Sequence, residues 1–306
     1  MSKATRRGIN TLAPLVPVLL LLATVGHQIS WALAWDRFGI SQRVVLLGAL
    51  TMLASAWQRH GIARAATAML GTVTLTWLIE LIGVGTGWPF GRYAYSESVT
   101  YERCPSLEVC SDLESVTHHI PALLGVPVIV PLAWFMMAYA TNRLGWLISE
   151  RRLVRWLWAS ASLCAWDLIL DPQFLLDPQL RGHGWWVWFH PSPALPGIPS
   201  IPLSNYAGWL IAAAAVHALL DFTLPGSMRP STTSARTSRR WDVPTLFYVW
   251  TWFGGIFLGL RELQSPAVAL WAGTTMAIPI VAAVRSARRA ASQPVDPDPV
   301  TSRRRG

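Results

Sequence analysis

The sequence predicts an all-α fold, a polytopic transmembrane bundle of about eight helices. The chain has 306 residues, of which 52% are hydrophobic and only 13% are charged, whereas about 25% of the residues of a soluble domain are charged. Apolar stretches recur along almost the whole chain and leave no room for a separate soluble core. We therefore expect one membrane domain over residues 11–284, between a short amino-terminal segment, 1–10, and a basic, disordered tail, 285–306.

Eight segments are apolar over the length of about 20 residues that a helix needs to cross a bilayer. In chain order they are residues 11–35, 43–58, 66–87, 120–140, 153–170, 205–224, 244–261 and 265–284. The first follows a basic start, as a signal peptide does, but it runs on to Trp31 and Trp35 without a clear small-residue cleavage site. We expect it to be a retained helix.

The distribution of basic residues predicts the topology. With the amino terminus in the cytoplasm, the segments on that side carry 19 of the 25 lysines and arginines, in residues 1–10, 58–65, 141–155, 225–243 and 285–306. This asymmetry follows the positive-inside rule and favours an even number of crossings, with both termini cytoplasmic, in the cell (plasma) membrane. The net charge of +9 then reflects topology signals or contacts with anionic lipids, and nucleic acid is not expected as a partner.

Two long loops, residues 88–119 and 171–204, then lie outside and are rich in aromatic and polar residues. The Pro-rich run from His190 to Pro202 cannot form a regular helix and indicates an interfacial or re-entrant segment.

Cysteines give little indication of chemistry. Cys164 lies inside an apolar segment and is expected to behave as a small hydrophobic residue. Cys104 and Cys110 share a polar loop, where a disulfide and a reduced pair both fit the sequence. With His118 and His119 they make only a weak zinc pattern, so we expect no metal.

Three carboxylates lie within or at the end of predicted helices. Glu80 lies well inside the third helix, where an unpaired charge is costly. Asp167 and Asp171 are four residues apart at the outer end of the fifth helix, so both project from one face, and Pro172 is expected to end that helix. Because these two helices run in the same direction, we expect the three acids in the outer half of the membrane, around one cavity.

These acids have two interpretations. They could be structural, with buried partners such as His27, Asn205 or backbone donors. Alternatively, two neighbouring carboxyl groups in an apolar environment can share one proton, so that one donates it while the other orients water or accepts a proton. Such a general acid–base pair needs no metal or organic cofactor.

Glycines and aromatic residues gather beside the acids. The glycines between residues 83 and 91 permit sharp turns where the third helix ends. No strand precedes them and no Lys-Ser/Thr follows, so a phosphate loop is not indicated. Many of the 18 tryptophans lie at predicted helix ends, as in aromatic belts. Another group could bind an apolar polyene or stabilise a transient carbocation, namely Trp88, Phe90, Tyr93, Tyr95, Trp185, Trp186 and Trp188.

Several motifs occur together between residues 75 and 210. They are Glu80 followed by Gly-Thr-Gly-Trp-Pro-Phe-Gly-Arg-Tyr-Ala-Tyr over 85–95, Gly125-Val126-Pro127 leading to Pro131-Leu132-Ala133-Trp134, Asp167 to Asp171-Pro172, Trp186-Val187-Trp188, Gly197-Ile198-Pro199, and Asn205-Tyr206-Ala207-Gly208-Trp209. In this combination the chain resembles the carotenoid biosynthesis family of integral membrane proteins, which includes carotenoid 1,2-hydratases. The loop 96–119 is longer than the family pattern, which leaves the substrate open.

The resemblance implies a cofactor-independent hydratase that acts on the terminal isoprenoid C=C bond of an acyclic carotenoid. Glu80, Asp167 and Asp171 would be catalytic, with one of the aspartates as proton donor and Glu80 positioning water. The substrate-binding residues would be the aromatic group above together with Trp134, Asn205 and Trp209. The partners would be a lipophilic carotenoid, water, the bilayer and other enzymes of the carotenoid pathway.

A non-catalytic carrier, binding or assembly protein for isoprenoid lipids is the alternative, in which the acids are coupling or structural groups. A transporter is expected to have inverted repeats or paired broken helices, and the sequence has no clear internal repeat. A serine hydrolase is not indicated, because the sequence has no Gly-x-Ser-x-Gly motif.

Overall fold

The structure, a computed structural model, describes residues 15–33, 37–95, 121–176, 185–224 and 241–292. These residues form eight long helices and three short β-ribbons. The helices are α2 (Val16–Leu33), α3 (Arg37–His60), α4 (Ile62–Thr86), α6 (Ile129–Ile148), α7 (Arg152–Leu176), α8 (Leu203–Thr223), α10 (Val243–Phe257) and α11 (Pro266–Ser292), and a π-helical turn, η6 (Leu258–Glu262), extends α10. The predicted helical bundle is therefore confirmed.

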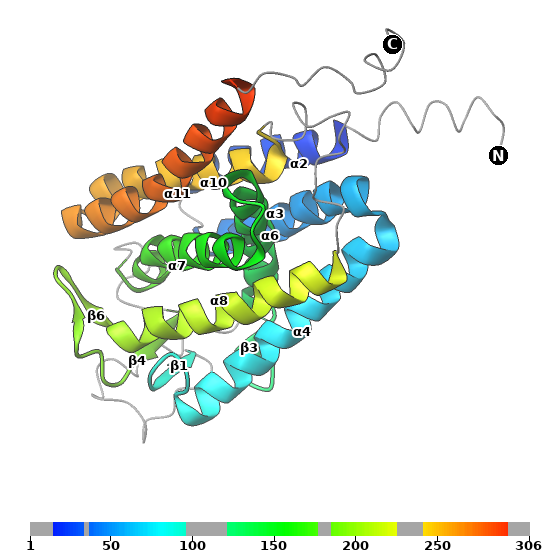
Figure 1. Cartoon of the computed structure of the whole chain (residues 1–306). Coiled ribbons are helices and arrows are strands. Elements are labelled where there is room, and N and C mark those ends of the chain that lie inside the picture. The colour runs from blue at the N-terminus through cyan, green and yellow to red at the C-terminus, as the bar shows by residue number, and fades with distance from the viewer. Residues whose placement is uncertain (1–14, 34–36, 96–120, 177–184, 225–240, 293–306) are drawn as a thin grey trace, which may run out of the picture.

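Seven of these eight helices, with α10 counted together with η6, are long and apolar enough to cross a membrane, and α6 is the helix that is not among them. Figure 1 places α6 in the middle of the bundle, where it contacts α3, α4, α7, α8, α10 and α11. Because most of α6 is enclosed by other helices, it can carry polar residues such as Asn142 and Arg143 without exposing them to lipid. The protein is thus a multi-pass membrane protein, while its membrane and the side on which the termini lie stay predictions.

The strands gather at one end of the bundle (Figure 1). The antiparallel pairs are β1 (Tyr93–Tyr95) with β4 (Trp186–Trp188), β2 (Ala122–Leu123) with β3 (Val126–Pro127), and β5 (Ala194–Leu195) with β6 (Ile198–Pro202). The Pro-rich run is accordingly a β-hairpin and not a helix. That it is interfacial or re-entrant stays a prediction.

The fourth helix differs from its predicted range of 120–140. It begins only at Ile129, because the residues before it form the β2–β3 hairpin, and it continues to Ile148. The basic segment 141–155 is therefore mostly helical. Arg143 and Arg155 are buried there and pair with Asp242 and Asp221, respectively.

Pro172 does not end α7, contrary to the prediction, and the helix continues to Leu176. A proline removes one backbone donor, but packing holds the turn that follows. The ring of Phe174 lies 4.4 Å from that of Trp185 and 5.3 Å from that of Trp186, measured between centroids. The predicted outer loop 171–204 therefore starts as helix.

Two other expectations fall partly or wholly outside the described residues. The tail was predicted from residue 285, but residues 285–292 are the helical end of α11, and residues 293–306 lie outside the described residues. Cys104 and Cys110 also lie outside the described residues. Cys164 is buried in α7, as expected for a small hydrophobic residue.

Asp242 ties three helices together at the end of the bundle opposite the strands. Its side chain caps α10 by accepting a hydrogen bond from the backbone N–H of Thr245. Its Oδ2 also lies 2.7 Å from Nε of Arg143, whose side chain is only 2% exposed, and 2.8 Å from Nη2 of Arg59. One carboxylate thus joins α3, α6 and α10.

We predict that Asp242→Ala lowers the free energy of unfolding by about 3–5 kcal/mol, because it leaves the buried Arg143 without this carboxylate and removes the cap. Asp242→Asn keeps an oxygen that can cap α10, so it should lose less free energy of unfolding than Asp242→Ala. Thermal unfolding in detergent, followed by tryptophan fluorescence, measures both. A Tm for Asp242→Ala equal to that of Glu150→Ala, a change at an exposed position, would contradict the role of this carboxylate.

Candidate active site

Glu80 belongs to the inward face of α4. The buried residues of this helix follow a helical spacing and are mostly small, namely Ala65, Ala68, Thr72, Thr76, Glu80 and Gly83. Small residues let α4 approach α6 and α8 closely. The same periodicity brings the Glu80 carboxyl group into the bundle, where the residue is 5% exposed.

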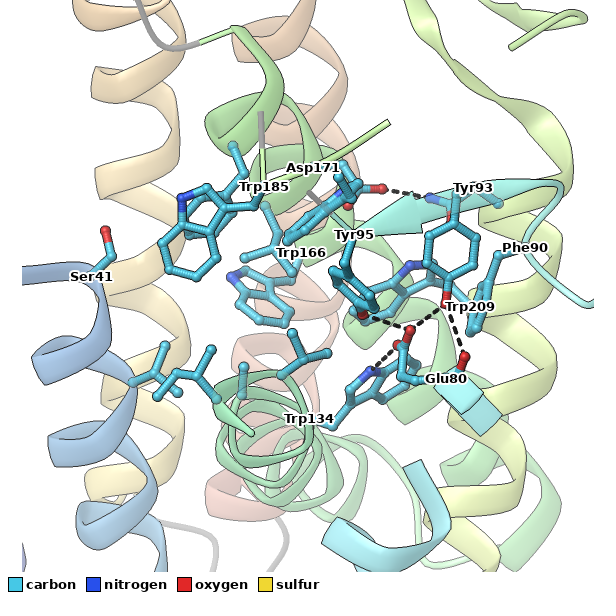
Figure 2. Close-up of a pocket in the computed structure, with 18 of the residues that line it drawn as sticks. Ser41, Glu80, Phe90, Tyr93, Tyr95, Trp134, Trp166, Asp171, Trp185 and Trp209 are labelled. Carbon is cyan, nitrogen blue, oxygen red and sulfur yellow. Dashed lines mark hydrogen bonds between the residues drawn. The ribbon is translucent and has the colours of Figure 1, made fainter. Parts of the chain in front are cut away.

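Three side chains donate hydrogen bonds to this carboxyl group (Figure 2). The hydroxyl groups of Tyr93 and Tyr95 lie 2.5 and 2.8 Å from Oε2 of Glu80. The indole Nε1 of Trp134, from the central helix α6, lies 3.1 Å from Oε1. The sequence had suggested these three aromatic residues for substrate binding, whereas the structure also makes them the hydrogen-bond partners of Glu80.

The β1–β4 ribbon brings the two tyrosines to Glu80. Alternate residues of a strand share a face, so Tyr93 and Tyr95 both point toward the acid, opposite Trp188 and Trp186 in the paired strand. This placement needs a tight exit from α4: the helix ends at Gly87 in the left-handed region, with φ of 81°. We did not predict this ribbon from the sequence. The Tyr-x-Tyr and Trp-x-Trp spacings are the pattern that could have indicated it.

Burial and the negative charge of Glu80 raise the pKa values of Tyr93 and Tyr95 well above that of an ordinary phenol. Both hydroxyl groups therefore keep their protons at neutral pH. They act as permanent donors to Glu80 and not as acids or bases in that range.

The other two acids form a separate pair on α7. Asp167 and Asp171 project from the same helical face, as predicted, and the Nδ2 atom of Asn205 donates to both, at 2.8 Å from Oδ2 of Asp167 and 2.6 Å from Oδ2 of Asp171. Asn205 lies in the first turn of α8. Of the buried partners considered from the sequence, Asn205 is thus confirmed for the aspartates. His27 instead bonds the carbonyl of Ala23 within its own helix.

Because both carboxyl groups contact the same nitrogen atom, Nδ2 of Asn205, they lie next to each other. A bond between two carboxyl groups requires a proton on one of them. Both residues are almost fully buried, at 0% and 3% exposure, so the pair is suited to hold one proton between two acids. Asp171 faces the pocket, whereas Asp167 lies behind it.

One pocket, which we call the acid pocket, brings Glu80 and Asp171 together. Its wall contains most of the aromatic residues expected from the sequence, namely Phe90, Tyr93, Tyr95, Trp134, Trp185, Trp186, Trp188 and Trp209, together with Asn205. Trp88 is the exception, because its side chain is 60% exposed and lies outside the pocket. Trp166, Phe174 and Ser41 also line it and were not identified from the sequence, where they look like ordinary helix residues.

The aromatic wall is ordered by ring contacts. Trp134 stacks on Trp209 with centroids 4.1 Å apart, and Trp166 meets Trp209 edge to face at 6.0 Å. Rings held in this way present π faces of fixed orientation, which attract positive charge. The pocket therefore combines a cation-stabilising wall with two acidic centres.

Two polar atoms at the site have spare hydrogen-bonding capacity within the described part of the chain. Nε1 of Trp188 is buried, lines the acid pocket and has no acceptor there. Oδ1 of Asp167 receives no hydrogen bond from an N–H or O–H donor of the described residues. Because buried polar atoms are almost always satisfied, the nitrogen of Trp188 suits a bound water or a polar group of a ligand. The oxygen of Asp167, which does not line the pocket, suits a proton shared with Asp171.

The fold and site define a class of protein, a multi-pass helical membrane protein whose aromatic pocket ends at buried carboxyl groups. The profile of the family described as "Carotenoid biosynthesis protein" matches residues 41–103 and 117–280. The chain belongs to this family, as the sequence motifs predicted.

One similar protein is the bisanhydrobacterioruberin hydratase of Haloarcula japonica. It is 29% identical over 164 residues, which are 52% of this chain and 45% of that protein. The match thus spans less than half of the length of that relative. No solved structure matches this chain significantly.

Gly83 of α4 lies close to Tyr93 of the β1–β4 ribbon. A Cβ atom added to Gly83 would lie 2.8 Å from the hydroxyl oxygen of Tyr93, whereas one added to Gly85, two residues on, meets nothing within 4 Å. Alanine favours helix over glycine by about 1 kcal/mol. Gly83→Ala should nevertheless lower stability by about 1–3 kcal/mol through overpacking, while Gly85→Ala leaves it equal or higher. Chemical denaturation in detergent compares them, and equal stabilities would contradict the placement of Tyr93.

Proposed function

We propose that this protein is a hydratase that adds water to the terminal isoprenoid double bond of an acyclic carotenoid, by acid catalysis and without a cofactor. Membership of a carotenoid biosynthesis family supports the substrate class, and the name of the Haloarcula relative supports the type of reaction. The observation that carries the proposal is the aspartate pair bridged by Asn205 at the aromatic pocket.

In the first step, the proton held by the aspartate pair passes to the less substituted carbon of the terminal double bond. Asp171 is the donor, because it faces the pocket, and Asp167 is the positioning residue behind it. The π electrons form the new C–H bond, and a tertiary carbocation remains on the neighbouring carbon. The aspartate pair is left with one more negative charge, which Asn205 stabilises through its two hydrogen bonds.

The second step is capture of the cation by water. A water oxygen forms the new C–O bond, and the proton that it releases returns to the aspartate pair, so that alkene and water become a tertiary alcohol with no other reactant. The carboxylate of Glu80 and the faces of Trp134 and Trp209 stabilise the intermediate charge. We assign the attacking water to the Nε1–H of Trp188, because this buried donor has no acceptor among the described residues and Trp188 lines the acid pocket.

We expect the chain, expressed in a host that makes lycopene or a longer acyclic carotenoid, to give pigments heavier by one water per modified end, as measured by mass spectrometry. Asp171→Asn should lower the rate about 10²–10⁴-fold, the usual contribution of a general acid. Asp167→Asn and Glu80→Gln should also lower it. The matched control is Glu150→Gln, which removes an exposed carboxylate at the opposite end of the bundle.

Protein level in the membrane is measured for each variant, so that loss of chemistry is distinguished from loss of folding. A wild-type chain that leaves every tested carotenoid unchanged would refute hydration of those substrates. If it then still retained bound pigment, a carrier or assembly role would take its place.

A further inference from the structure

The acid pocket is too small for a whole carotenoid. Its volume is about 60 Å³, and a buried water takes up about 10–15 Å³ on the same scale. The pocket thus has room for the end of an isoprenoid chain and a water. The rest of a linear substrate must lie elsewhere.

A second cavity, which we call the chamber, lies next to the acid pocket. Its volume is about 380 Å³, within the range of about 300–1,000 Å³ that is usual for small-molecule sites. It is enclosed by α2, α3, α7 and α10, with Met136 of α6 contributing to the wall. The side chains around it are mostly aliphatic or aromatic, so it suits an apolar ligand.

The chamber and the acid pocket share part of their wall. Ser41 and Val45 of α3 and Trp166, Leu170 and Phe174 of α7 line both. Figure 2 shows this side of the acid pocket, with Ser41 and Trp166 lying away from Glu80. The two cavities therefore lie against the same side chains, and a molecule that occupied both would have to pass between these residues.

The rim of the chamber faces outward from the bundle. Ile29 and Leu33 of α2 and Phe253 and Phe257 of α10 line it and are also 45–79% exposed. Both helices are long and apolar enough to span a membrane. Exposed apolar side chains on membrane-spanning helices contact lipid, so the α2 and α10 side of the chamber faces the bilayer.

We propose that the chamber binds the hydrocarbon chain of a linear isoprenoid lipid, which enters sideways from the bilayer between α2 and α10 and places its end in the acid pocket. This proposal rests on the proposed function for the identity of the end group, but chain binding can be tested without any reaction. It assigns a binding role to residues of α2 and α10, which contribute nothing to the acid pocket.

Gly254 allows the chamber to be filled selectively. It lines the chamber, and a Cβ atom there meets nothing within 4 Å. Gly26, on α2, also has nothing within 4 Å of an added Cβ, but it is exposed and does not line the chamber. Gly254→Phe and the milder Gly254→Leu are therefore matched by Gly26→Phe and Gly26→Leu.

The proteins are purified in mild detergent from a host that makes lycopene, and the carotenoid retained per protein, lycopene and its hydrated products together, is measured by absorbance. Wild type and the Gly26 variants should retain carotenoid, and Gly254→Phe should retain at least about tenfold less, with Gly254→Leu between them. If wild type hydrates lycopene, kcat/KM is also measured for lycopene and for geraniol, a short isoprenoid with the same terminal group. The ratio of the lycopene value to the geraniol value should fall by a similar factor in Gly254→Phe.

Each contrary outcome overturns a different claim. If wild type retains neither lycopene nor a hydrated product, or if the Gly254 and Gly26 variants retain equal amounts of carotenoid, the chamber does not bind the chain. If the two substrates lose kcat/KM equally, the change acts on the acid pocket and not on chain binding. If wild type retains lycopene in a Gly254-dependent way but hydrates nothing, the hydratase proposal fails and the chamber proposal stands.

Discussion

The carboxyl group of Glu80 is buried among helices, and the need to satisfy it shapes the end of the bundle at which the strands lie. A buried carboxyl group without partners would cost several kcal/mol, and no donor on α4 itself reaches it in the described structure. The donors come from Tyr93 and Tyr95 on the β1 strand and from Trp134 on α6. The ribbon must therefore fold back against the helix from which it emerges.

The two acidic centres differ in what surrounds them, and this difference suits them to different roles. Glu80 has three donors and needs no proton of its own to be satisfied. Asp167 and Asp171 share the amide nitrogen of Asn205, and the indole of Trp186 is a further partner of Asp171. The pair thus has fewer donors per oxygen than Glu80, and a proton shared between the two acids completes its hydrogen bonding. An acid that three donors can hold as a carboxylate then lies in the same pocket as a proton donor, which suits a reaction that passes through a cation.

Much of the fold was predictable, because apolar segments of sufficient length can only be helices in a bilayer. The convergence of Glu80 and Asp171 on one pocket also followed from the direction of their helices. The hydrogen-bond partners of Glu80 could not be predicted in this way, because the Tyr-x-Tyr pattern indicates a strand only once the Trp-x-Trp strand that pairs with it is known. The extension of α7 past Pro172 depends on the tertiary packing of Phe174, which local sequence does not encode.

The arrangement of the two cavities suits the chemistry proposed for the protein. A carbocation in contact with bulk water is captured without control, so the site must admit one water and exclude the rest. An apolar chain in the chamber would close the side of the acid pocket lined by Ser41, Trp166 and Phe174. The substrate itself would then complete the enclosure of its reacting end, and chain length would contribute to the reaction as well as to binding.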